Sequence, residues 1–376
     1  MAGRGGGEYS MTKKRLWLLA RCWLAVIAVG LLGSTVYMVY DLSTSMAAAK
    51  IRHAARLDPT KTEAGRTASA NRAGELGVTP KNLVVKTGIY VDRVYDFAVA
   101  NNSWSLDFYI WFNWKGNTIY PDKSFQMVEG VINEKKCEAQ LDQGDEHYVL
   151  CRVSATITKH FNVSRFPRDD HMLTVRIEDT VFQNFDLNYV ADIEGSDLSS
   201  RAKFMGYKPY YKKLLVKDHS YKTRRGDPRL PEGYKATYTQ LIYGIGIKRD
   251  GWGLYFKMFL GIFSSLAVAL IAFFVRPDDL DPRFGVGVGA FFAGVASAYL
   301  TAGEVPQTSA FGLADFVNGS SLILILLTVL TSAMSLGIHR VHGCETMARR
   351  FDLYALAVFL IGVIILNVSV AITASF

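Results

Sequence analysis

The chain has 376 residues, of which half are hydrophobic and a fifth are charged, and its formal net charge is +8. This length allows two or three domains, and this composition argues against a wholly soluble protein. The Lys and Arg residues are spread along the chain without a basic helix or a platform of stacking aromatic residues, so nucleic acid is not an expected partner.

The N-terminal region begins with a basic segment, residues 1–15, which leads into a long apolar run that ends at Tyr40. A cleaved signal peptide has a shorter apolar region with small residues close behind it, whereas Ala47–Ala49 come well after this run. We therefore expect a cytoplasmic N-terminus and an uncleaved transmembrane anchor over residues 16–40, rather than a cleaved signal. Residues 41–80 are rich in Ser, Thr, Ala and Gly and predict a basic flexible tether, whose first part could be helical.

Residues 81–250 have a different pattern, with a period of two. Runs of β-branched and aromatic residues are separated by Gly, Pro, Asn and Asp, without helical segments between them. This pattern predicts an antiparallel β-sandwich. Cys137 and Cys151 flank a polar turn between two such runs. They could form a disulfide if the domain lies outside the cytoplasm, and two unpaired strand cysteines are the alternative.

The chain after Arg249 consists mainly of apolar segments that approach or exceed the length needed to cross ~30 Å of hydrocarbon. They predict a four-helix transmembrane domain over residues 251–376. The loop before the last segment contains Arg340, Arg349 and Arg350, so the positive-inside rule places it in the cytoplasm. The sandwich and the C-terminus would then be extracytoplasmic, which agrees with the predicted anchor. The four segments are residues 252–275, 284–301, 316–338 and 353–374.

The second of these segments is unusually rich in small residues. At helical spacing one face combines small residues with an acid at one end and two aromatic residues, and such a helix could line a narrow pore formed by several copies. The alternative is that the small residues allow close helix packing in a membrane. The candidate pore-lining residues are Asp281, Gly285, Gly289, Phe292, Ala296, Tyr299 and Gly303. The bulkier face, expected to contact other helices, has Val286, Val288, Phe291, Val295 and Leu300.

Several motifs carry a family resemblance. In HFNVSRFPRDDHMLTVRIED, the residues Phe166, Pro167 and Asp169 match a signature loop, while Arg168 replaces the usual aromatic residue. TGIYVDRVYDF and FYIWFNWKG are similar to two successive strands of the same family, and EVPQTS to a loop between membrane helices, with Pro306 at the matching position. Together they resemble the pentameric ligand-gated ion channel (Cys-loop receptor-like) superfamily, most closely its prokaryotic members, over roughly residues 85–376.

The resemblance implies a homopentameric, multi-pass membrane protein of a bacterial inner (plasma) membrane. Inorganic ions, the lipid bilayer and either a small-molecule ligand or protons would be its partners. Glycine packing in the predicted pore helix, the lack of a proline in the first helix of the pore domain and the additional anchor favour the alternative of a non-conducting receptor or scaffold on the same fold. The signature-loop cysteines are replaced by Lys159 and Leu173, as in bacterial members of the family, and the segment between Trp114 and Tyr148 is shorter than the family norm.

The resemblance also suggests residues that link the two domains. Phe166, Pro167 and Asp169 lie in the signature loop, Arg249 ends the last strand, and Pro306 lies in the loop after the predicted pore helix. An ion pair between Asp169 and Arg249 would transmit movement of the sandwich to the membrane helices. The alternative is a partly solvated salt bridge that contributes under about 1 kcal/mol.

A ligand would bind between neighbouring sandwiches, at a site lined by aromatic residues. The loop TRRGDPRLPEG resembles the capping loop of that site, and aromatic cages bind cations through cation–π attraction. The alternative is that these residues are ordinary core or cross-strand pairs. The candidates are Tyr221, Tyr234, Tyr238, Phe182 and Phe185, with Tyr109 and Trp111 from the neighbour's side.

The sequence contains no convincing catalytic or metal-binding pattern, so we expect neither an enzyme nor a cofactor. Asp169, Asp170 and His171 are adjacent before a strand, and neighbouring strand residues point to opposite sides. For the pore, a ring of Asp281 predicts cation conduction, whereas Arg283 followed by glycines also resembles anion-selective pore helices. Five copies of Phe292 could close the path by dewetting, with Tyr299 as a second constriction.

Overall fold

The computed structural model describes residues 5–58, 83–228, 230–305, 311–342 and 345–375. The chain divides into two compact units. The helical unit contains the chain up to Ala47, residues 163–169 and everything from Gly251 onward. The sheet unit contains residues 48–162 and 170–250.

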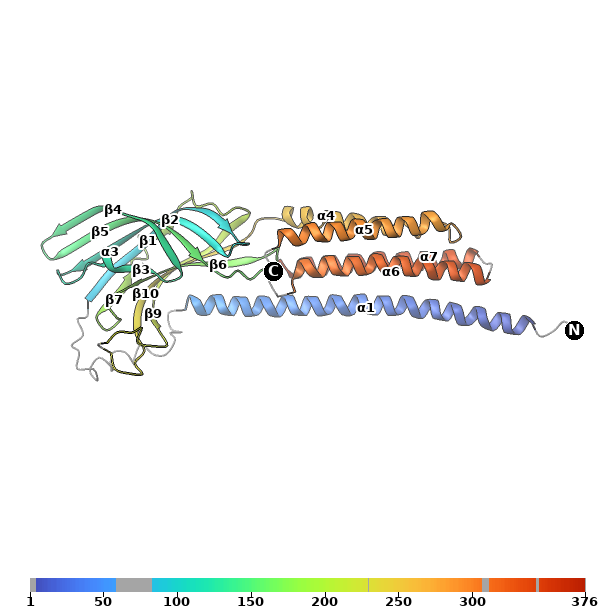
Figure 1. Cartoon of the computed structure of the whole chain (residues 1–376), viewed down its shortest axis with the longest axis horizontal. Helices are drawn as coiled ribbons and strands as arrows, with labels where there is room; N and C mark the ends of the chain where they lie inside the picture. The colour runs from blue at the N-terminus through green and yellow to red at the C-terminus, as the bar shows by residue number, and fades with distance from the viewer. Residues whose placement is uncertain (1–4, 59–82, 229, 306–310, 343–344, 376) are drawn as a thin grey trace. The chain divides into compact units, whose positions relative to one another are not determined.

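The described strands of the sheet unit form two sheets (Figure 1). The first has the order β4–β5–β2–β1–β7, and β8 also pairs with β1. Both β7 and β8 run parallel to β1, so this sheet is mixed rather than antiparallel as expected. The chain passes through the second sheet before it returns to β1, and this crossover permits a parallel pairing. The strands are β1 (Leu83–Ala98), β2 (Ser103–Lys115), β4 (Gly130–Gln143), β5 (Glu146–Thr158), β7 (Leu187–Ala191) and β8 (Asp197–Leu198).

The second sheet is antiparallel throughout, in the order β3–β6–β10–β9. The short helix α3 (Pro121–Ser124) precedes β3, so the segment between Trp114 and Tyr148 contains α3, β3 and β4. A disulfide joins Cys137 of β4 to Cys151 of β5. The strands of this sheet are β3 (Phe125–Met127), β6 (Asp170–Asp179), β9 (Tyr207–Ser220) and β10 (Thr237–Arg249).

The core of the sheet unit lies between the two sheets. Alternate residues of β5, and of β2 from Phe108 onward, are buried, as the period-two pattern requires, and the ring of Phe112 on β2 lies 5.4 Å from that of Phe125 on β3. The outer face of the second sheet is covered at β10 by Leu57, which packs with Met172 and Ile242. A Cβ at Gly244 would lie 2.7 Å from Leu57 Cδ2, so the glycine makes room for this contact.

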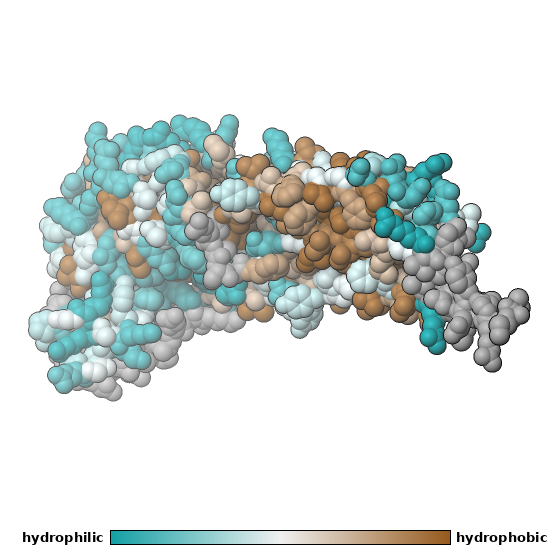
Figure 2. All heavy atoms as spheres, turned by 45° about the vertical axis from the view of Figure 1, so that its right-hand side comes forward, coloured by the Kyte–Doolittle hydropathy of each residue, from teal (hydrophilic) through white to brown (hydrophobic). Residues whose placement is uncertain are grey.

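Among the described residues, five helices are long and apolar enough to cross a membrane, as a multi-pass membrane protein requires. Hydrophobic side chains gather over these helices in Figure 2, whereas hydrophilic ones predominate on the strands. Helix α1 continues to Arg56, so residues 41–56 of the predicted tether are helical, while residues 59–80 lie outside the described part. The helices are α1 (Gly5–Arg56), α4 (Gly253–Ile271), α5 (Leu280–Glu304), α6 (Leu313–His342) and α7 (Glu345–Thr373).

Within the helical unit, α1 packs against α6 and α7. The indole Nε1 of Trp23 donates a hydrogen bond to Thr331 Oγ1 of α6 at 3.1 Å. Leu31 fits against Gly362 of α7, where a Cβ would lie 2.5 Å from Leu31 Cδ1. The apolar stripe of α1, with Leu24, Ile27, Leu31, Met38 and Leu42, belongs to the same buried core as the other helices. The predicted anchor is therefore an integral part of this helical core.

Candidate functional site

Helix α5 is flanked by α4 and α6, and one of its faces is left uncovered. All seven candidate pore-lining residues are exposed on this face. The side chains of Phe292 and Tyr299 are 68% and 81% exposed. Gly285, Gly289 and Gly303 have open space where a Cβ would stand. The uncovered face therefore combines small residues, two projecting aromatic rings and the carboxylate of Asp281.

The face of α5 that contacts other helices differs from the one expected. Val288, Val295 and Leu300 of the bulky face are exposed, so they are not covered by other helices of the same chain. The buried positions are Arg283, Gly287, Ala290, Gly294 and Thr301. A Cβ at Gly287 would lie 2.7 Å from Val329 Cγ2 of α6, and one at Gly294 3.1 Å from Ile325 Cδ1 of the same helix. Small residues allow this close approach, so the glycines of α5 serve both a packed face and an open one.

Arg283, near the start of α5, is completely buried. Its Nη2 donates to Asp352 Oδ1 of α7 at 2.6 Å and its Nη1 to Asp352 Oδ2 at 3.0 Å. Nη1 also donates to the carbonyl oxygen of Val275 at 3.2 Å. A bidentate pair compensates the positive charge of the guanidinium and fixes its orientation. Arg283 therefore points into the helical core, away from the uncovered face that carries Asp281.

Residues 163–169 of the predicted signature loop belong to the helical unit. The carbonyl oxygen of Ser164 accepts a hydrogen bond from the backbone N–H of Leu313, the first residue of α6, at 2.8 Å. Phe166 is buried, and its peptide bond to Pro167 is cis. The loop is thus attached directly to the helix that follows the α5–α6 connection.

Arg168 makes several contacts within the helical unit, although sequence reasoning treated it only as a departure from the family pattern. Its Cζ lies 4.3 Å from the ring centroid of Trp252, a cation–π distance. Its guanidinium donates to the carbonyl oxygen of Gly251 and, over 3.1 Å, to Ser375 Oγ. Arg168 therefore connects the loop to the start of α4 and to the C-terminal end of the chain.

The remaining coupling candidates do not all belong to one unit. Asp169 is buried, with 1% of its surface exposed. Arg249 lies in the sheet unit, where its Cζ is 3.9 Å from the ring centroid of Tyr207. Asp169 and Arg249 belong to different units, so their ion pair stays a prediction. Pro306 lies outside the described residues.

Tyr109 and Trp111 line a shallow hollow of about 560 Å³ on the first sheet. The indole Nε1 of Trp111 donates to Asp192 Oδ2 at 3.0 Å, and Lys86 Nζ lies 3.0 Å from Asp192 Oδ1. A Cβ at Gly88 would lie 2.3 Å from the Trp111 ring, so the glycine is required there. Partial burial acts to raise the pKa of Asp192, but the hydrogen bonds from Lys86 and Trp111 lower it below its usual value. The carboxylate is thus charged at neutral pH and compensated by Lys86.

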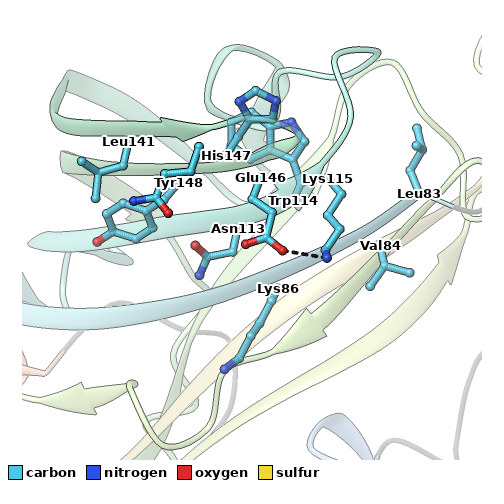
Figure 3. Close-up of a pocket in the computed structure, with 11 residues that line it drawn as sticks. Leu83, Val84, Lys86, Asn113, Trp114, Lys115, Leu141, Glu146, His147 and Tyr148 are labelled. Atoms are coloured by element: carbon cyan, nitrogen blue, oxygen red, sulfur yellow. Dashed lines mark ion pairs between the residues drawn. The ribbon is translucent and has the colours of Figure 1, made fainter.

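A larger open hollow of about 700 Å³ lies beside it, lined by β1, β2, β4 and β5 (Figure 3). The ring of His147 stacks on that of Trp114, with centroids 5.2 Å apart. Lys115 Nζ lies 2.7 Å from Glu146 Oε1, and the two side chains are more than half exposed. The hollow therefore offers aromatic surface and paired charges, which suits a small polar ligand. Sequence reasoning did not identify it, because its residues come from four strands.

One of the aromatic candidates of the second sheet, Tyr221, contacts a buried acid, Glu178. The rings of Tyr221 and Tyr238 lie edge to face, with centroids 5.8 Å apart. Tyr221 OH donates to Glu178 Oε1 of β6 at 2.6 Å, and burial, together with this bond, raises the pKa of the phenol well above its usual value. Tyr234 packs in the same cluster. Phe182 and Phe185 are half-buried in the loop after β6.

Arg225, from the loop between β9 and β10, completes this cluster. Its Cζ lies 4.5 Å from the ring centroid of Tyr221 and 5.1 Å from that of Tyr238. Its Nη1 lies 3.2 Å from Glu178 Oε1. Sequence reasoning identified the tyrosines but neither Glu178 nor Arg225. The Arg-Arg-Gly run between Tyr221 and Tyr238 was the signal in the sequence that could have indicated a cation beside these rings.

The described part of the chain contains no group of three or more His, Cys, Asp or Glu residues that could hold a metal ion. A scan against protein-family models found no match to this chain. A search of curated proteins likewise found none.

Proposed function

We propose that this chain is one subunit of a homopentameric ion channel that an extracytoplasmic ligand or a proton opens. The fold would be an extracytoplasmic β-sandwich followed by a four-helix transmembrane pore domain, with α1 as an additional anchor. The channel would lie in a bacterial inner (plasma) membrane.

The observation that carries this proposal is the uncovered face of α5. Asp281 would be costly against hydrocarbon, and Gly285 and Gly289 would offer lipid tails little to pack against. Both features are accommodated when five copies of α5 surround a water-filled path. The face covered by α4 and α6 has its own small residues, so close packing within one subunit does not explain the uncovered glycines.

The charges near the start of α5 support cation conduction. Asp281 is exposed, whereas Arg283 is buried and paired with Asp352. In a ring the mouth would therefore carry five carboxylates without the arginine charges beside them. Such a ring attracts cations and repels anions.

The loop 163–169 supports a route for gating. Ser164 contacts the first residue of α6, and Arg168 contacts Gly251 and Trp252 beside α4. Movement of the sandwich would pass through this loop to the helices on both sides of α5. The hollow at Tyr109 and Trp111 and the cluster around Tyr221 and Tyr238 are the candidate ligand sites.

The proposal is tested with the purified full-length chain in two measurements. Particle images in mild detergent should contain rings of five subunits, and reconstituted protein should conduct current across a planar bilayer. A stable monomer would contradict the assembly. Rings that carry no current under any applied ligand or pH would instead favour a non-conducting receptor or scaffold.

A further inference from the structure

Three cations come together where the end of α1 lies on the second sheet. Arg56 is the last residue of α1, Lys159 directly follows β5, and Arg176 lies in β6. Arg56 and Arg176 are close enough for their positive charges to act on the ammonium of Lys159. All three residues belong to the sheet unit, and we call them the cation cluster.

Contacts between α1, β6 and β9 hold the cation cluster in place. Leu57, directly after α1, packs against Met172 of β6. The carbonyl oxygen of Leu57 accepts a hydrogen bond from Lys213 Nζ of β9 at 3.0 Å, and the carbonyl oxygen of Met172 accepts one from Lys159 Nζ. These acceptors are uncharged, so the hydrogen bonds fix the positions of the two amines and leave their positive charges in place.

The charges of the cation cluster are incompletely balanced. Glu129, just before β4, pairs with Arg176, and this one carboxylate balances one of the three cations. The Nε of Arg176 is nevertheless buried without a hydrogen-bond partner among the described residues. Burial, and secondarily the charges of Arg56 and Arg176, hold the pKa of Lys159 at about 7 in spite of Glu129. An anion would supply an acceptor for the buried Nε and would favour the charged form of Lys159.

We propose that the cation cluster binds a doubly charged phosphate or sulfate group. Such a group balances the two cations that Glu129 leaves uncompensated. The planar guanidinium fork of an arginine matches two oxygens of a tetrahedral oxyanion, and the ammonium group of a lysine pairs with it as a point charge. The bound anion ties the end of α1 to β6 and to the segment after β5, so it stabilises the attachment of this end to the second sheet.

The position of the cluster along α1 favours a soluble anion over a lipid headgroup. The distance from Tyr40, where the predicted anchor ends, to Arg56 is about 24 Å along this continuous helix, at a rise of 1.5 Å per residue. The headgroup region extends only about 5–8 Å beyond the hydrocarbon. The inference does not depend on whether the chain assembles into a conducting ring.

The first test is a calorimetric titration of the full-length chain in detergent with sodium sulfate, below pH 7, where the Lys159 ammonium is charged. Saturable binding at millimolar sulfate is expected. Lys159→Met should weaken it several-fold, and Glu129→Gln should strengthen it several-fold because the competing carboxylate is removed. The matched control is Lys136→Met, at an exposed lysine of β4, which should leave the affinity unchanged. Absence of saturable binding to the wild-type chain, or equal affinities of the wild type and Lys159→Met, overturns the proposal.

A second variant keeps the proposal testable if Lys159→Met does not fold. Arg56→Gln changes an exposed side chain at the end of a helix, so it removes one charge with little change in packing. Relative to sodium chloride at equal ionic strength, sulfate should raise the midpoint temperature of unfolding less in this variant than in the wild type. Sulfate also stabilises folded proteins because it is excluded from their surfaces, but both chains share this effect. Equal rises would reject the cluster as the binding site.

Phosphatidic acid added to the detergent micelles distinguishes the two sources of a phosphate group. It should raise the midpoint temperature of the wild-type chain no more than that of Arg56→Gln. A rise with phosphatidic acid that depends on Arg56, without a corresponding rise with sulfate, would reject the soluble ligand in favour of a lipid headgroup.

Discussion

Arg283 of α5 and Asp352 of α7 form a bidentate ion pair with no exposed surface on the arginine side chain, with Nη–Oδ distances of 2.6 and 3.0 Å. The pair joins the first turns of α5 to the first turns of α7, although α6 lies between these two helices in the sequence. It also removes a positive charge from the neighbourhood of Asp281. Both consequences can be tested by changing one side chain at a time.

Asp352→Asn should destabilise the helical unit strongly. It leaves the Arg283 guanidinium buried without a counterion, and breaking a buried pair in this way costs about 3–5 kcal/mol. Thermal unfolding of the full-length chain in detergent measures the loss. The matched control is Glu345→Gln on the same helix, which breaks the exposed pair with Arg349 and should cost under about 1 kcal/mol. Equal losses in the two variants would mean that the Arg283–Asp352 pair contributes no more than a surface contact.

Phe292→Ala should give channels that leak without stimulus, because Phe292 is the projecting apolar ring in the middle of the uncovered face. The measurement is the resting current of reconstituted protein. Phe291→Ala serves as the control, since this neighbour is half-buried and packs with the helical core. The dewetting argument fails if the two variants leak equally, or if neither leaks.

Asp281→Asn should reduce the preference for cations by several-fold, since it removes the exposed carboxylate while Arg283 remains paired. The shift of reversal potential in a salt gradient reports this preference. Asp278→Asn, in the exposed turn before α5, should change it less. A wild-type current carried by chloride would reject the acidic ring but leave the channel proposal standing.

Lys159 predicts a pH dependence of the sheet unit. Burial, and secondarily the positive charges of Arg56 and Arg176, lower the pKa of Lys159 to about 7 from an ordinary value of 10.5. Between these two values the unfolded chain holds a proton that the folded chain has released, so the free energy of unfolding should rise with pH from about 7 to about 10. The slope should approach about 1.4 kcal/mol per pH unit.

Chemical unfolding between pH 7 and 9 measures this slope. Lys159→Met should flatten it and should raise stability at or below pH 7, where the buried charge is unfavourable. Lys136→Met, at an exposed lysine of β4, should retain the wild-type slope. If the free energy of unfolding changes with pH by the same amount in the wild-type chain and in both variants, Lys159 does not titrate as stated.

Length and periodicity alone were sufficient to predict the long apolar helices and the strands of the sheet unit. Hydrophobic burial depends on local spacing, which is written in the sequence as a period of two or of 3.6. The same reasoning grouped Asp281, Gly285 and Phe292 on one face of α5. It could not identify which of the remaining faces of α5 would be covered by other helices, because glycines suit both a packed and an open surface.

Only the tertiary structure decided the pairings between distant residues. Asp352 follows Arg283 by 69 positions, and Arg225 follows Glu178 by 47. The parallel pairing of β7 with β1 is likewise set by the route of the chain between two sheets. Charges and hydrogen bonds act over a few ångströms in space without a sequence period, so a sequence shows which groups need partners but not which partners they find.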